Sequence, residues 1–146
     1  MATNKKGRRK IEPVDLEFAA RLSGVVPEWT ITVDNSRLVP RSSAQTLIER
    51  DYHAATMSPG DSYPRDERER REVLLHECGH LLVADISGFI DRITALIPDP
   101  GARKLANQQA DIFEEHICDR FAKAMIRALE THPPKSEQAC ECEGHS

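Results

Sequence analysis

The first part of the chain changes from a helical to an extended pattern. Residues 13–24 begin with a proline, place apolar side chains at helical spacing and end at a glycine, which predicts a short helix. The segment EWTITVDN at 28–35 then alternates apolar and polar residues, as a half-buried strand does. Further extended stretches are predicted at 44–51, where a helical turn is the alternative, and at YHAATMSP, 52–59. These patterns predict a sheet of about three strands.

Helical patterns dominate the rest of the chain. Residues 65–89 have a charged first half and an apolar second half, with apolar side chains recurring three and four positions apart. A short separate helix is predicted at 89–97, before a break at Pro98 and Pro100, and a long one at 105–130. We therefore expect an α+β fold, with the small sheet packed on the helix at 65–89 and on the last helix.

Charge divides the chain into three parts. The net charge is −4, and the first ten residues carry five of the positive side chains. We expect a basic, disordered arm at 1–12, one folded domain at 13–132 and a polar, disordered tail at 133–146. The folded part is acidic and would repel a polyanion, so a nucleic acid is not the expected partner.

The sequence also bears on the cellular compartment. The basic arm has no apolar region behind it, and no membrane-spanning run is evident, so we expect a cytoplasmic protein without a membrane partner. The four cysteines have no regular spacing, and they would stay reduced in that compartment. Cys78 and Cys118 are predicted to be small core residues.

Residues 74–83, LLHECGHLLV, contain the spacing H-E-x-x-H at His76, Glu77 and His80. Histidines four apart on a helix lie on the same face, so both imidazoles reach one cation. Zinc accepts such nitrogen ligands, and an adjacent carboxylate can serve as general base toward a water beside the metal. Apolar residues flank the motif on both sides, which favours a buried site over an accidental surface pair. The motif predicts Zn²⁺ as cofactor, with Glu77 as the base.

The third ligand must come from elsewhere in the chain. A metzincin would continue with a glycine and a third histidine, but Val83 and Ile86 occupy those positions. Glu115 and Asp119 are four residues apart on the last helix, so that one carboxylate could complete the ligand set while the other holds a ligand imidazole. Register and this spacing favour Glu115 over its neighbour Glu114 as the ligand, and a change at Glu114 is expected to be nearly silent.

The segments HECGHLL at 76–82 and EHICDRFA at 115–122 resemble those of the gluzincin metallopeptidases, most closely small ImmA/IrrE-type peptidases of bacteria and phage. The resemblance covers roughly residues 28–130. It implies a zincin-like domain in which His76, His80 and Glu115 bind zinc, Glu77 is the catalytic base and Asp119 supports a ligand. It also implies that the segment at 52–59 is the edge strand along which a peptide substrate pairs.

The leading functional hypothesis is a zinc-dependent peptidase that acts on a peptide or protein substrate. The alternative is a zincin-fold regulatory protein that binds metal without catalysis. Four residues are candidates for stabilising the oxyanion of the reaction: Tyr52, His53, Arg92 and His116. In the tail, Cys140, Cys142 and His145 have a spacing that would let them bind the open position of the zinc and keep the enzyme inactive. A tail without this role is the favoured interpretation.

Overall fold

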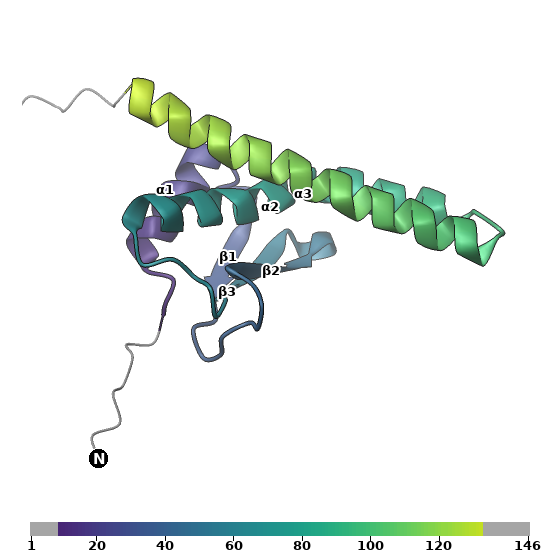
Figure 1. Cartoon of the computed structure of the whole chain (residues 1–146), viewed down its shortest axis with the longest axis horizontal. Coiled ribbons are helices and arrows are strands. Elements are labelled where there is room, and N and C mark those ends of the chain that lie inside the picture. Colours follow the sequence, from purple (N-terminus) through teal and green to yellow (C-terminus); the bar gives the residue numbers. More distant parts are fainter. Residues whose placement is uncertain (1–8, 133–146) are drawn as a thin grey trace, which may run out of the picture.

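The computed structural model describes residues 9–132, which form an α+β fold with three helices and a small sheet (Figure 1). The tail with Cys140, Cys142 and His145 lies outside the described residues, as does most of the predicted arm. The elements, in chain order, are α1 (Pro13–Ser23), β1 (Thr30–Val33), β2 (Ala44–Glu49), a short 3₁₀ helix (Arg50–Tyr52), β3 (Ala54–Pro59), α2 (Glu67–Ala95) and α3 (Pro100–Thr131).

The three strands are ordered β1-β3-β2. β3 lies in the centre, parallel to β1 and antiparallel to β2. The prediction that the segment at 52–59 forms an edge strand is therefore wrong: it contains the central strand, and β2 is the edge nearer the last two helices. The segment at 44–51 is extended up to Glu49, and the alternative helical turn follows it at Arg50–Tyr52.

The two long helices are longer than the sequence pattern predicted. The short helix expected at 89–97 is the continuation of α2, because no residue between Phe89 and Ala95 interrupts the backbone hydrogen bonds. α3 begins at Pro100, five residues before the predicted start. Asp99 caps it by accepting a hydrogen bond from the Ala102 amide, and the proline lies in the first turn, where its missing N–H has no partner to lose.

The core lies between α1, the first half of α2, α3 and the sheet. Asp15 of α1 is buried and forms ion pairs with Arg70 (2.7 Å) and Arg71 (3.6 Å), which attach α1 to the start of α2. Cys78 and Cys118 are both fully buried, as predicted. The distal parts of α2 and α3 continue as a hairpin that projects beyond the sheet (Figure 1).

α2 is long and apolar enough to cross a membrane by length and composition alone. Its most apolar window of 18 residues has a mean hydropathy of 1.4, and 44% of that window is buried inside the fold. The buried residues on α2 include Leu74, Leu75 and Leu81, which pack in the core.

Candidate metal centre

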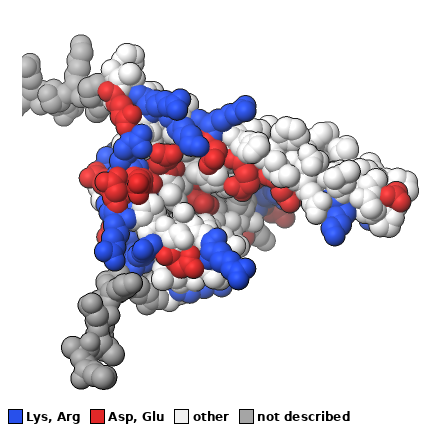
Figure 2. Space-filling view, in the orientation of Figure 1, with Lys and Arg blue, Asp and Glu red and all other residues white. Residues whose placement is uncertain are grey.

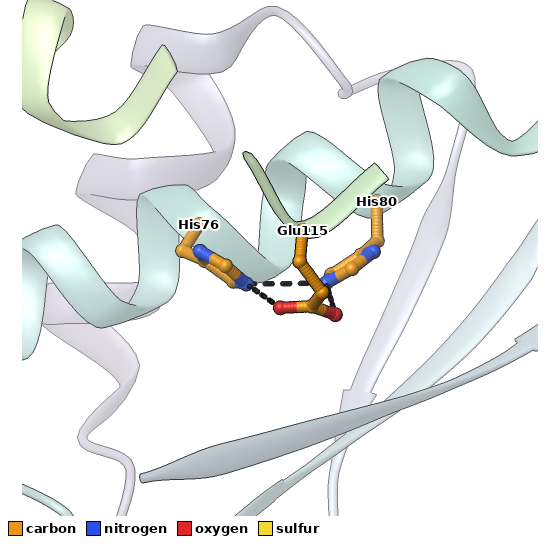
Figure 3. Close-up of side chains that lie close together, drawn as sticks. All are labelled: His76, His80 and Glu115. Carbon is orange, nitrogen blue, oxygen red and sulfur yellow. Dashed lines mark hydrogen bonds and ion pairs between the residues drawn. The ribbon is translucent and has the colours of Figure 1, made fainter. Parts of the chain in front are cut away.

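His76 and His80 lie one turn apart on α2 and point in the same direction (Figure 3). Their Nε2 atoms are 3.2 Å apart. Each ring is mostly buried, with 18% of the His76 side chain and 15% of the His80 side chain exposed. The sequence prediction that both imidazoles share one helix face is confirmed.

Glu115 of α3 completes this group from the opposite helix. One carboxylate oxygen lies 3.2 Å from Nε2 of His76, and the other lies 3.4 Å from Nε2 of His80 (Figure 3). One potential ligand atom from each of the three residues lies within 4.8 Å of the others. The structure thus brings together the three residues predicted from sequence as metal ligands.

The back of each ring contacts a second carboxylate on α3. Nδ1 of His76 lies 3.0 Å from Asp119, and Nδ1 of His80 lies 2.8 Å from Glu114. A carboxylate only accepts, so Nδ1 of each ring is the donor in these contacts. In the neutral tautomer with its proton on Nδ1, each imidazole has its lone pair on Nε2, on the side that faces Glu115 and where it could bind a cation.

The spacing of these atoms fits a small cation. Two ligands held at about 2.0–2.1 Å by a tetrahedral ion stand about 3.3–3.4 Å apart. The two Nε2 atoms are 3.2 Å apart, and the two carboxylate oxygens of Glu115 lie 3.2 Å from Nε2 of His76 and 3.4 Å from Nε2 of His80. The donor set of nitrogen and oxygen atoms and its dimensions are therefore compatible with a small cation.

Glu114 takes a larger part than the sequence indicated. The register argument placed only Glu115 toward the site and expected a nearly silent neighbour, but the Glu114 carboxylate contacts His80 and also accepts a hydrogen bond from Ser87 at 2.5 Å. Adjacent residues on α3 diverge, yet an imidazole offers two nitrogens on opposite sides. Glu115 lies near Nε2 of the His80 ring, and Glu114 contacts Nδ1 on the opposite side of the same ring. Both carboxylates therefore face the site.

Glu77 lies beside the cluster and points toward the sheet. Its side chain is 7% exposed, and one carboxylate oxygen accepts a hydrogen bond from the Thr46 hydroxyl of β2 at 2.6 Å. The hydroxyl fixes one oxygen of Glu77 and leaves the other without that constraint. Sequence reasoning did not find Thr46, because the pairing register of β2 that aims it at α2 is a property of the folded sheet.

A groove of about 770 Å³ runs between these elements. Its walls come from α2, α3 and the edge strand β2, and it contains the metal-ligand cluster together with Glu77. Within residues 9–132, β2 pairs with β3 and has no strand on its opposite edge, beside the groove.

None of the four proposed oxyanion-stabilising residues lines this groove within the described part of the chain. Tyr52 is 79% exposed, and His53 stacks against Trp29 with ring centroids 5.1 Å apart. The cationic side chain on the groove wall is Arg68, which forms ion pairs with Glu72 and Glu130.

The two buried cysteines lie under the cluster without joining it. Burial raises the pKa of the Cys78 thiol to about 11 and that of Cys118 to about 12. Both thiols are therefore protonated near neutral pH and are poor metal ligands. The ligand set is one of nitrogen and oxygen.

Comparisons with protein-family models, with curated proteins and with solved structures found no match.

Proposed function

We propose that this protein is a zinc-dependent peptidase whose metal is held by His76, His80 and Glu115. The observation that carries the proposal is the convergence of His76, His80 and Glu115 at distances compatible with a small cation, next to Glu77 and inside a groove. Two histidines with a glutamate are a ligand set of catalytic zinc sites, which keep a position open. Zinc, when bound, supplies a positive charge that polarises a carbonyl and lowers the pKa of water toward about 7.

The residues of the chain divide the remaining work among them. Glu77 removes a proton from the attacking water and later returns it to the leaving amine, and Thr46 holds its carboxylate in place. Asp119 and Glu114 keep the proton of each imidazole on Nδ1, so that both Nε2 atoms remain available. This division of roles matches the expectation from the HExxH motif.

The substrate of such a site is an extended peptide or protein segment. The free edge of β2 borders the groove, and its unpaired N–H and C=O groups can pair with an added strand. β2 thus replaces the segment at 52–59 as the strand along which a substrate would lie. A metal-binding protein without catalysis is the alternative, and it has no use for a carboxylate positioned as Glu77 is.

Glu77→Gln tests the proposal. The variant is expected to keep about one zinc per chain, because all three ligands remain, and to lose at least about 100-fold in hydrolysis of an unfolded protein substrate. Glu72→Gln is the matched control, since Glu72 also lines the groove but does not contact the cluster. Metal content and cleavage rate of both variants are compared with those of the parent. Cleavage by Glu77→Gln at the parental rate contradicts the peptidase mechanism.

A further inference from the structure

The projecting half of α2 carries an exposed apolar stripe. Its side chains alternate four and three residues apart, and their exposed fractions run from 46% to 76%. They are Leu82, Ile86, Phe89, Ile93 and Leu96, here called the α2 stripe. Spacing of four and three residues is that of a coiled-coil seam, which one helix presents to another.

The same helix face is covered in the first half of α2. There α1 packs against α2, and Arg71 lies over the Phe18 ring of α1 at 4.2 Å. α1 ends at Ser23, and beyond that level nothing in residues 9–132 covers the stripe. Figure 2 shows that the projecting hairpin carries few charges on the face in view. The stripe is a helix-packing face without its second helix.

The two flanks of the stripe differ in character. One flank carries the exposed charges Asp85 and Arg92, seven residues apart. The other flank carries Val83 and Ile90, which line a mostly apolar groove shared with α3 whose lining also includes Asp91, Asp111 and Glu114. On the α3 side this groove is lined by Phe113 and Ile117, which are 64% and 52% exposed.

We infer that the α2 stripe is a dimer interface that binds the same stripe of a second copy in antiparallel orientation. When two identical helices pair antiparallel, each flank faces its own counterpart across the seam. Asp85 of one copy then faces Arg92 of the other, twice by symmetry, and the apolar groove faces its own copy. Parallel pairing would instead bring the charged flank of each helix against the apolar flank of the other. The opposite charges of Asp85 and Arg92 therefore favour a second copy of this chain as the partner and an antiparallel orientation of the two helices.

Sedimentation equilibrium of the full chain tests the interface. The parent is expected to be a dimer, and Phe89→Glu is expected to weaken association at least about 30-fold, because it places a charge in the middle of the seam. Leu105→Glu is the control: Leu105 is as exposed as Phe89, at 58% against 56%, but lies on α3 outside the stripe and the groove. Circular dichroism verifies that both variants fold. A monomeric parent overturns the inference, as does equal weakening by both variants.

Orientation is tested by exchanging the flanking charges. Asp85→Arg places like charges opposite each other at both ends of an antiparallel seam and should weaken the dimer about 3- to 10-fold. The double variant Asp85→Arg and Arg92→Asp restores opposite pairs and should recover the parental affinity. If the double variant stays as weak as the single one, the antiparallel pairing is wrong. Flotation of the parent with phosphatidylcholine vesicles, lost in Phe89→Glu, would instead assign the stripe to a lipid surface and overturn the dimer.

Discussion

The histidines of the centre are held from two sides by carboxylates of a single helix. Glu115 lies in front of both rings, while Asp119 lies behind His76 and Glu114 behind His80. The Glu114 carboxylate is itself fixed by Ser87. A histidine ligand whose second nitrogen is fixed in this way has one tautomer and one orientation, which raises its affinity for a metal.

Three alanine variants separate these roles. Glu115→Ala should lower zinc affinity the most, because it removes a ligand. Glu114→Ala and Asp119→Ala should each lower it about 10- to 100-fold, because each frees one imidazole to rotate and to change tautomer. His116→Ala is the control, since its exposed side chain does not line the groove. The measurement is zinc titration against a competing chelator. If Glu114→Ala retains the affinity of the His116→Ala control, its contact with His80 has no part in metal binding.

The hydroxyl of Thr46 gives a second prediction. Thr46→Val preserves the shape of the side chain but removes the hydrogen bond that orients Glu77. We expect kcat to fall about tenfold while zinc content stays unchanged, because the base remains present but less well aimed. Thr56→Val is the matched control, because Thr56 bonds to Thr32 on the neighbouring strand and does not line the groove. Equal kcat values for the two variants would remove Thr46 from the mechanism.

The sequence was informative about residues whose spacing along one helix sets their geometry. His76, Glu77 and His80 were identified in this way, and so was the pair of Glu115 and Asp119. The sequence did not predict contacts that depend on how two elements pack against each other. The contact of Glu114 with His80 depends on the rotation of α3 against α2, and the contact of Thr46 with Glu77 depends on strand register. Neither quantity has a local signal in the chain.

At the scale of elements, the site depends on how closely α2 and α3 approach each other. The approach is set at Gly79, between the two histidines: a Cβ placed there would lie 3.1 Å from the Cys118 Sγ and 3.2 Å from its Cα. Cys118 is thus the residue of α3 that lies directly against Gly79. If larger side chains occupied the positions of Gly79 and Cys118, α2 and α3 would lie further apart and Glu115 would be separated from the two histidines.

Gly79→Ala tests this approach. A methyl group there presses on backbone as well as side-chain atoms of Cys118, so α3 must shift, and we expect a loss of about 1–2 kcal/mol in the free energy of unfolding together with weaker zinc binding. Gly88→Ala is the control on the same helix. Its added Cβ would meet the flexible side chain of Arg50 at 3.3 Å, so the gain in helix propensity should leave stability equal or higher. Urea unfolding measures both variants. A stable Gly79→Ala with full zinc affinity would show that the helices do not need this contact.

The order of strands illustrates the same limit for elements. Alternation predicted three strands at about the correct positions, and the segment at 52–59 was assigned to the edge. Alternation shows which face of a strand is buried but not which strands are its neighbours. β3 has buried residues toward its end, at Met57, Ser58 and Pro59: Met57 pairs with both β1 and β2, and beyond it Ser58 and Pro59 pair with β2.

At the scale of the whole molecule, the centre joins α2 and α3, which are also connected by packing, by a short turn and by the ion pair of Arg68 with Glu130. Two ligands belong to α2 and the third to α3, so a bound metal links the helices across the groove. The two Nε2 atoms and the Glu115 carboxylate lie within 3.2–3.4 Å of one another, so a cation held by all three would join α2 to α3. Metal binding should therefore stabilise the fold as well as complete the site.

Removal of the metal gives the last prediction. A ligand that binds only the folded chain stabilises it by about 4 kcal/mol when its free concentration is 1,000 times Kd. For a chain of this size that corresponds to a rise in Tm of about 10 °C, which a chelator should reverse. Calorimetry with zinc and with chelator should give this shift for the parent and for Glu77→Gln, whose three ligands are intact, and little or no shift for Glu115→Ala. An equal shift in Glu115→Ala would place the stabilising metal elsewhere in the chain, whereas no shift in any variant would mean that the converging atoms do not bind zinc.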